Sequence, residues 1–455
     1  MTLVDLFEFT PVRYQLGNSL KFDKSNSILY IPEGYLNKLE RLNEKLNFLE
    51  FTLKTIKPKN KVGVVKVGDL TVQILPKLLR GGYEELEAKD NKRLVMNNLI
   101  EMLAIAEEVP ITPAEVAELE KTDAEFLEIL ITLYSKKLLS LLKFERYYTY
   151  KHVEDELTTV KGQIDFARYS QKWHRRYIVP LKYNERTMDN TLNRTLKYAS
   201  YLMLRMTKNR DNYRRLKAVL SIFDTVSLKP ISIPEIERIQ FNRLNVVFRP
   251  LVNLAKVFIE GSSVSLKSSK LETFTFLVPM ERVFEKFIAN TILKHRRQVL
   301  PEKLMDAKIT FQHHIGYLLG GERGKYFELR PDLTIESSAG RFVVDMKYKL
   351  LKPEEKKLGV SQADLYQMYA YATKWNADGV LLVYPTLEEQ IEKEWHFEIE
   401  TLTGRKDIPL IIRTINLGYD LKNEWEAFLL EINKSLVKLI DTVRITVASP
   451  PEATQ

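Results

Sequence analysis

The chain has 455 residues; 45% are hydrophobic and 28% charged, and 69 Lys and Arg against 60 Asp and Glu give a net charge of +9. This composition excludes a disordered chain and can fill more than one core. The absence of cysteine excludes disulfide scaffolds, thiol nucleophiles and cysteine-based zinc sites. The basic excess favours a polyanion as partner.

Membrane insertion is not expected from the sequence. The longest apolar runs, such as residues 380–384, have the length of a strand and not of a transmembrane helix. The N-terminus lacks the basic region of a signal peptide. Together with the lack of cysteine, these features predict a cytoplasmic protein.

Strand and helix signals alternate in the N-terminal region. Residues 61–75 alternate between polar and apolar and are interrupted by Gly68 and Asp69, which predicts a hairpin with a two-residue turn. Apolar residues then recur at helical spacing over residues 91–144, and strand-like alternation returns over residues 147–166. We therefore expect a β-rich N-terminal part with a helical insertion.

The remaining chain predicts a helical region followed by a mixed α/β region. Residues 188–223 have helical spacing, and a serine-rich stretch at 261–269 is a candidate boundary. After it, helix and strand signals alternate up to a long helix at 422–442. The expected class is an α+β multidomain protein, with a β-rich domain at 1–165, a helical middle region at 166–268, an α/β domain at 269–445 and a disordered tail at 446–455.

Two acidic side chains and a lysine are predicted to meet on one hairpin. Residues 327–335 and 341–349 are rich in strand formers and are separated by a turn sequence. Because side chains alternate along a strand, Asp345 and Lys347 project from the same face, and pairing can bring Asp332 beside them. Two carboxylates suit Mg²⁺, and a lysine can position an attacking water.

The alternative is an ion pair on a half-buried strand. Apolar residues 342–344 directly precede Asp345, which predicts a central strand where unpaired charges are costly. The pattern resembles the PD-(D/E)xK nuclease superfamily, with Pro331 before Asp332 and an Asp-x-Lys thirteen positions later. The resemblance implies phosphodiester hydrolysis at these three side chains.

Two flanking helices add candidates that the resemblance suggests. Nucleases of this type often take another acid from the first helix, here Glu285, as a catalytic residue and metal ligand. A helix after the hairpin carries Gln362 and Tyr366 at i and i+4, which is similar to the Gln-x-x-x-Tyr element that faces DNA in the RecB-like branch. Simpler interpretations stay open: a solvated glutamate on an amphipathic helix, and a helix capped by Ser361 with packed tyrosines.

Three further segments, 72–78, 181–197 and 280–287, extend the similarity to most of the chain. Together they resemble the McrC family, the nuclease subunits of modification-dependent McrBC restriction systems. The resemblance implies a Mg²⁺-dependent DNA endonuclease that acts on methylated double-stranded DNA. It also implies a hexameric AAA+ GTPase partner of the McrB type, which reads the modified base. The N-terminal part of the present chain would bind this partner, and the chain would stimulate the partner's GTP hydrolysis.

The chain is expected to lack a nucleotide site of its own. The segment 320–326 is similar to a phosphate-binding loop but is one residue short, carries Tyr326 where Ser or Thr is needed, and leads into a strand. The basic clusters 172–177 and 208–215 can follow a DNA backbone or simply be solvated. Two alternative functions stay open, a stand-alone RecB-like repair nuclease and a non-catalytic activator of an AAA+ motor.

Overall fold

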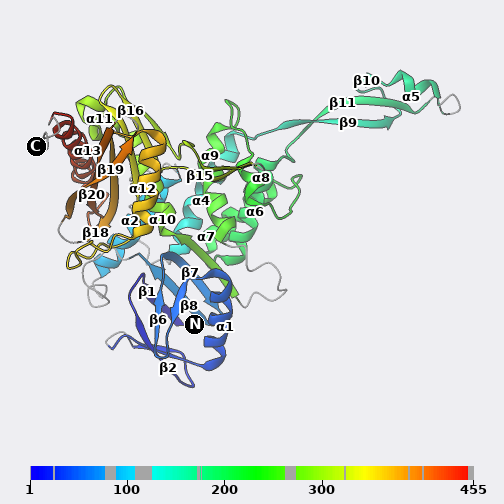
Figure 1. Cartoon of the computed structure of the whole chain (residues 1–455). Coiled ribbons are helices and arrows are strands. Elements are labelled where there is room, and N and C mark those ends of the chain that lie inside the picture. The colour runs from blue at the N-terminus through cyan, green and yellow to red at the C-terminus, as the bar shows by residue number, and fades with distance from the viewer. Residues whose placement is uncertain are drawn as a thin grey trace, which may run out of the picture. The chain divides into compact units, whose positions relative to one another are not determined.

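The computed structural model describes residues 2–23, 26–76, 89–107, 126–171, 175, 177–261, 273–321, 324–387, 390–401 and 404–448. The chain divides into two compact units (Figure 1). Unit 1 combines Met1–Lys121 with Leu277–Gln455, and unit 2 is Thr122–Phe276. None of the described helices is long and apolar enough to cross a membrane.

Two small sheets form the N-terminal part of unit 1. The hairpin of β7 (Lys61–Val67) and β8 (Leu70–Leu75) is confirmed, and Gly68 in its two-residue turn has φ +57°, which favours glycine. With β1 (Thr2–Phe7) and β12 (Thr273–Pro279), whose last three residues belong to unit 1, it forms a sheet in the order β1-β8-β7-β12. The second sheet, in the order β3-β4-β2-β6-β5, comprises β2 (Val12–Leu16), β3 (Lys21–Asp23), β4 (Ile28–Ile31), β5 (Leu49–Phe51) and β6 (Thr55–Pro58), with α1 (Glu33–Leu46) between β4 and β5.

A pair of helices links this part to the C-terminal half of the same unit. Helix α2 (Lys89–Ala106) packs against α10 (Met280–Lys294). Lys286 of α10 makes an ion pair of 2.7 Å with Glu107, which directly follows α2. Two segments that are far apart in the sequence, residues 1–121 and 277–455, therefore pack together within unit 1.

A six-stranded sheet in the order β13-β16-β17-β18-β20-β19 forms the C-terminal half of unit 1. Strands β17, β18 and β20 are parallel neighbours, whereas the remaining pairs are antiparallel. The expected central position of residues 342–344 is confirmed, because β17 lies between β16 and β18. The strands are β13 (Lys308–Phe311), β16 (Leu333–Ser337), β17 (Gly340–Met346), β18 (Gly379–Thr386), β19 (Glu392–Thr401) and β20 (Gly404–Asn416).

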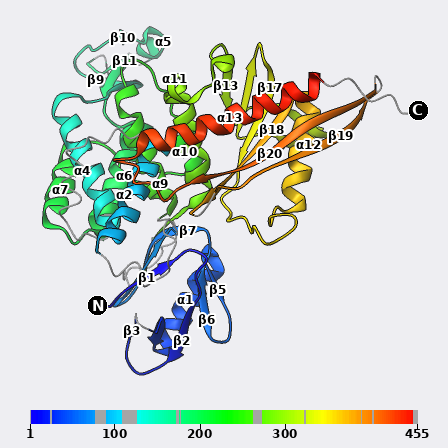
Figure 2. The ribbon, with the colours of Figure 1, turned by 90° about the vertical axis from the view of Figure 1, so that its left-hand side faces the viewer.

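Helices α12 (Gln362–Trp375) and α13 (Trp425–Ala448) cover the two faces of this sheet (Figure 2). On the α12 face, Met368 packs in one core with Val343 and Val380. On the other face, Gly379 lies so close to α13 that a Cβ atom there would be 2.8 Å from Val443. Strands buried on both faces are apolar along their whole length, as β18 is.

Unit 2 combines helices with one extended sheet. The sheet, in the order β10-β11-β9, leaves the helices of its own unit as a long ribbon (Figure 1). Its elements are β9 (Thr149–Leu157), β10 (Gln163–Ile164), α5 (Phe166–Gln171) and β11 (Val179–Thr187). The helices are α4 (Phe126–Phe144), α6 (Thr191–Met206), α7 (Arg210–Ile222), α8 (Ile233–Glu237) and α9 (Arg249–Gly261).

These units differ from the regions expected at 1–165, 166–268 and 269–445. Helix α4 packs with α7 and α9 because its apolar face is buried by them, so it belongs with the later helices. The expected helical region also contains a strand, β11, which pairs with β9. Helix α13 continues to Ala448, so the expected tail is helical at its start. The rest of the tail and residues 262–269 of the serine-rich stretch lie outside the described residues.

Candidate active site

Asp332 and Asp345 meet at one end of the central hairpin. The expected strand 327–335 is interrupted after Leu329, because Pro331 has no backbone N–H to continue the ladder. Asp332 therefore lies in the short connection before β16. Its carboxylate accepts a hydrogen bond of 2.8 Å from the backbone N–H of Met346, the residue after Asp345. This contact brings the two acids to the same place.

Lys347 completes the group that the sequence predicted. It follows the last residue of β17, and its Nζ atom lies 2.7 Å from Oδ2 of Asp345. Asp345 is 1% exposed and Asp332 is 8% exposed, so both carboxylates are largely removed from water. One ammonium thus faces two buried acids, and the cluster carries an excess of negative charge.

The electrostatics of the two acids follow from this imbalance. Burial raises the pKa of Asp332, and the nearby charges of Asp345 and Glu285 raise it further. Burial also raises the pKa of Asp345, although Lys347 opposes the shift. Burial alone would lower the pKa of Lys347, but Asp345 raises it above its ordinary value, so the lysine is a firmly held cation.

Glu285 approaches the same acids from α10. The helix buries Phe284 and Phe287 and leaves Glu285 half-buried on the side of the cluster. Burial and the charge of Asp345 raise the pKa of Glu285 to about 7. The glutamate is therefore close enough to interact electrostatically with the pair.

The donor set of Asp332 and Asp345 suits a divalent cation that keeps most of its water ligands, and not one that is enclosed by protein ligands alone. Among the described residues, no three His, Asp or Glu side chains gather as a metal site. Mg²⁺ commonly takes only one or two carboxylates and keeps several waters. A cation between these two acids would also relieve the repulsion that raises their pKa values.

A chain of hydrogen bonds orients Lys347, and it was missed in the sequence. The Nζ atom donates to Oε1 of Gln367 at 2.9 Å. The Gln367 amide donates to the hydroxyl of Tyr371 at 2.8 Å, and this hydroxyl donates to the carbonyl of Arg330 at 3.1 Å. The chain ends two residues before Asp332. Helix α12 thus connects the lysine to the segment that carries the first acid.

Gln362 and Tyr366, the predicted pair, lie one and a half turns earlier on α12. Their side chains are exposed and hydrogen-bond to each other. The same Gln-x-x-x-Tyr spacing occurs again at Gln367 and Tyr371, and this second copy makes the contact with Lys347. The repeated spacing was the signal that could have identified the second pair.

A second ion pair lies beside the cluster at the start of α12. Ser361 caps the helix by accepting from the N–H of Asp364. Lys349 lies 2.7 Å from the Asp364 carboxylate. Burial alone would raise the pKa of Asp364, but hydrogen bonds from Lys349 and Ser361 lower it. This acid is neutralised locally, in contrast to Asp345.

The remaining sequence motifs lie elsewhere. Of the segment 320–326, the described residues lie in a two-stranded ribbon of β14 (Gly316–Gly321) and β15 (Gly324–Leu329), which agrees with the expectation that it leads into a strand. The basic cluster 172–177 is mostly outside the described residues. In the cluster 208–215, Arg215 hydrogen-bonds to Asn212 and Ser135 within unit 2.

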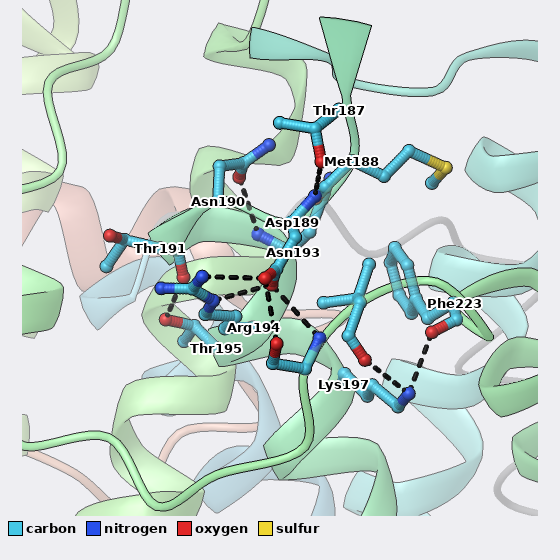
Figure 3. Close-up of polar contacts among 12 residues, drawn as sticks. Thr187, Met188, Asp189, Asn190, Thr191, Asn193, Arg194, Thr195, Lys197 and Phe223 are labelled. Atoms are coloured by element: carbon cyan, nitrogen blue, oxygen red, sulfur yellow. Dashed lines mark hydrogen bonds and ion pairs between the residues drawn. The ribbon is translucent and has the colours of Figure 1, made fainter. Parts of the chain in front are cut away.

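Unit 2 contains a second polar cluster, built around the acid Asp189, at the junction of β11 and α6 (Figure 3). The Asp189 carboxylate accepts two hydrogen bonds from the Arg194 guanidinium, from Nε at 2.6 Å and from Nη2 at 2.7 Å. The backbone N–H and hydroxyl of Ser227 donate to the same carboxylate. These bonds, with that from Arg194 the largest cause, hold the pKa of Asp189 well below its usual range.

Two neighbouring side chains complete this junction. Asn190 caps α6 by accepting from the N–H of Asn193. The buried amide of Asn193 donates to the carbonyls of Tyr147 and Met188. The network therefore joins the two chain segments at the base of the extended ribbon to the first helix after it, which is a structural role.

Comparison with known proteins now assigns the chain to a family. The profile of one protein family, McrBC 5-methylcytosine restriction system component, matches residues 56–385, well over half of the chain. The chain belongs to this family. The resemblance drawn from the sequence is thereby confirmed, and the matched range contains both acidic clusters.

One of two similar solved structures agrees at the level of the fold. One chain of a half-complex from a tetradecameric assembly of Thermococcus gammatolerans McrB AAA+ hexamers with bound McrC is 20% identical, with a TM-score of 0.60 over 96% of this chain and 100% of that chain. A chain of the Thermococcus gammatolerans McrBC complex is 22% identical, with a TM-score of 0.48 over 65% and 88%. A comparison with curated proteins gives no significant match.

Proposed function

We propose that this McrBC component is the DNA endonuclease subunit of a modification-dependent restriction complex and belongs to the PD-(D/E)xK superfamily. One observation carries the proposal: Asp332 and Asp345, both buried, meet Lys347 at the end of a central strand. Buried like charges are costly unless a ligand compensates them. A bound Mg²⁺ ion would meet this requirement, and its remaining positive charge could then hold a DNA phosphate.

The side chains divide the proposed chemistry among them. Asp332 and Asp345 hold Mg²⁺, with Glu285 next to them. When bound, the ion acts as a Lewis acid on the scissile phosphate and stabilises the leaving oxygen. Lys347 holds the attacking water through its ammonium, which Gln367 and Tyr371 keep in one orientation. The predicted reaction is in-line hydrolysis of a phosphodiester.

The partner in this proposal is a hexameric AAA+ GTPase similar to McrB. The solved relative of 20% identity comes from an assembly of McrB hexamers with bound McrC, which supports a similar partner here. We place docking and stimulation of GTP hydrolysis in the N-terminal part, and recognition of methylated double-stranded DNA in the partner. Gln362 and Tyr366, exposed on α12, remain candidates for DNA contact.

The test uses Asp345→Ala in the assembled complex with the GTPase, GTP, Mg²⁺ and methylated DNA. We expect cleavage to be abolished while stimulation of GTP hydrolysis is retained, because the acid belongs only to the hydrolytic site. Unmethylated DNA is the substrate control. Loss of both activities in a folded variant would contradict the division of labour.

The same assay separates the two alternative functions. Cleavage by the chain alone, without a GTPase, would favour a stand-alone RecB-like repair nuclease. Unchanged activity of both Asp332→Ala and Asp345→Ala would favour a non-catalytic activator of the motor.

A further inference from the structure

Tyr348 directly follows Lys347 and makes an unusual buried contact. Its hydroxyl donates a hydrogen bond of 2.8 Å to Oε2 of Glu8, at a sequence separation of 340 residues. Glu8 is 0% exposed and Tyr348 is 6% exposed. A carboxylate and a phenol thus meet inside unit 1, one residue away from the proposed catalytic lysine.

The ring of Tyr348 also touches the helix that carries Glu285. It packs against Phe284 with ring centroids 5.7 Å apart. Phe284 directly precedes Glu285, and Tyr348 directly follows Lys347. The contact therefore links the residue next to Lys347, Tyr348 itself, to the residue next to Glu285.

The backbone around Lys347 needs such an anchor. Strand β17 ends at Met346, and the N–H of Lys347 makes one further hydrogen bond of 2.9 Å, to the carbonyl of Val383 in β18. The residues after it, up to α12, form no regular helix or strand. Fixing Tyr348 at both its ring and its hydroxyl limits where this end of the strand can lie.

Glu8 is itself held firmly by the N-terminal sheet. It follows β1, and its N–H donates to the carbonyl of Leu75 at 3.1 Å. The next residue, Phe9, has φ +60°, a strained value for a bulky residue, and its N–H donates to Pro58 at 2.9 Å. These two hydrogen bonds and the left-handed conformation of Phe9 fix the backbone at Glu8, so that its side chain points toward Tyr348.

We propose that Glu8 and Tyr348 are positioning residues that connect the N-terminal sheet to the proposed nuclease site. The buried bond fixes Tyr348, and Tyr348 fixes Lys347 and α10 relative to Asp345. An apolar pair would fill this space without the desolvation of a carboxylate, so the polar contact serves orientation and not merely packing. The inference rests on the proposed nuclease function.

The test compares Tyr348→Phe, Glu8→Ala and Glu8→Gln in the assembled complex. Substitution of a residue that supports a metal site from outside typically lowers metal affinity or activity by about 10- to 100-fold. We expect Tyr348→Phe and Glu8→Ala to raise the Mg²⁺ concentration for half-maximal cleavage and to lower the maximal rate by about this range. Glu8→Gln keeps an acceptor oxygen and is expected to restore most of the rate.

Tyr419→Phe is the matched control. Tyr419 donates to Glu431 at 2.9 Å, a bond of the same type in the same unit, between the loop after β20 and α13. We expect this variant to lose thermal stability without any change in the Mg²⁺ dependence. The folded fraction of every variant is measured by circular dichroism, and rates are expressed per folded molecule.

The outcomes are distinct from a failure of the proposed function. Wild-type rate and Mg²⁺ dependence in folded Glu8→Ala would overturn the positioning role, and so would equal shifts in Tyr419→Phe. A failure of Tyr348→Phe to fold leaves the decision to Glu8→Ala and its rescue by Glu8→Gln. Undiminished cleavage by Asp345→Ala would instead overturn the nuclease assignment.

Discussion

Two acidic clusters in this protein are opposites. Asp189 in unit 2 receives donors from Arg194 and Ser227, which together satisfy both of its oxygens. Asp345 in unit 1 pairs with Lys347 and shares its surroundings with Asp332 and Glu285. The pKa of Asp189 is lowered by its hydrogen bonds, above all that from Arg194, whereas burial raises the pKa of Asp345.

The contrast distinguishes acids whose ionised form stabilises the fold from acids whose ionised form needs a bound ligand to compensate its charge. Where donors match the charge, ionisation of the carboxylate favours the folded state. Where acids outnumber cations, ionisation opposes folding, and the cost persists because function requires it. Hydrogen-bond partners, and not burial alone, therefore distinguish Asp189 from Asp345.

The largest expected effect comes from the same substitution in each cluster. Asp345→Asn is expected to abolish Mg²⁺-dependent cleavage while the free energy of unfolding stays unchanged or rises, because a buried repulsive charge is removed. Asp189→Asn is expected to lower the free energy of unfolding by about 2 kcal/mol, since charged hydrogen bonds are lost. Chemical denaturation and a cleavage assay measure both properties.

One combination of results would contradict the contrast between Asp189 and Asp345. Strong destabilisation by Asp345→Asn, with no loss by Asp189→Asn, would reverse the roles assigned to the two clusters. Asp211→Asn is a suitable control, because this acid is exposed at the start of α7 and is expected to change neither property.

The second prediction concerns the two Gln-x-x-x-Tyr pairs of α12. Gln367→Ala and Tyr371→Phe are expected to slow cleavage by about 10- to 100-fold, because they release the orientation of Lys347. Gln362→Ala and Tyr366→Phe are the matched controls on the same helix. If they act through DNA contact alone, they weaken DNA binding and leave the rate at saturating DNA unchanged.

A rate loss at saturating DNA in the Gln362 variant, but not in the Gln367 variant, would contradict the structure. The measurement is therefore the maximal rate and the DNA concentration for half-maximal rate, determined separately for all four variants.

The sequence was sufficient to predict the hairpin constellation because it depends on local rules. Strand alternation places Asp345 and Lys347 on one face, and the turn length sets the pairing that brings Asp332 beside Met346. The helix phase of α12 was not predictable in this way. Both glutamine–tyrosine pairs satisfy the same spacing, and only packing of α12 against β18 selects Gln367.

Long-range contacts escaped the sequence for a related reason. Glu8 and Tyr348 carry no periodic signal that connects them, and their meeting depends on the assembly of the N-terminal sheet with the six-stranded sheet. The division into units was also missed, since helix α4 has the same apolar pattern whether it packs with α2 or with α7. Local patterns specify elements, whereas tertiary packing selects their partners.

The smallest effect is the pH dependence of stability, and it has opposite signs in the two clusters. Glu285 has a raised pKa of about 7, and the pKa values of Asp332 and Asp345 are raised as well. In Mg²⁺-free protein the folded state therefore binds more protons than the unfolded state above about pH 4, and stability falls as pH rises toward neutrality. Asp189, whose pKa is lowered, contributes stability above about pH 4 that is lost only in acid.

Calorimetry of Mg²⁺-free protein between about pH 5 and about pH 8 measures this difference, and we expect a loss on the order of 1 kcal/mol, discounted for the partial exposure of Glu285. Adding Mg²⁺ is expected to offset the loss and to stabilise more at the higher pH, because protons compete with the ion for the same oxygens. Asp345→Asn should remove the stabilisation by Mg²⁺, whereas Asp189→Asn should retain it. Equal stabilisation by Mg²⁺ at both pH values in the wild type would place its binding away from the acids of raised pKa, and the contrast between the clusters would lose its functional meaning.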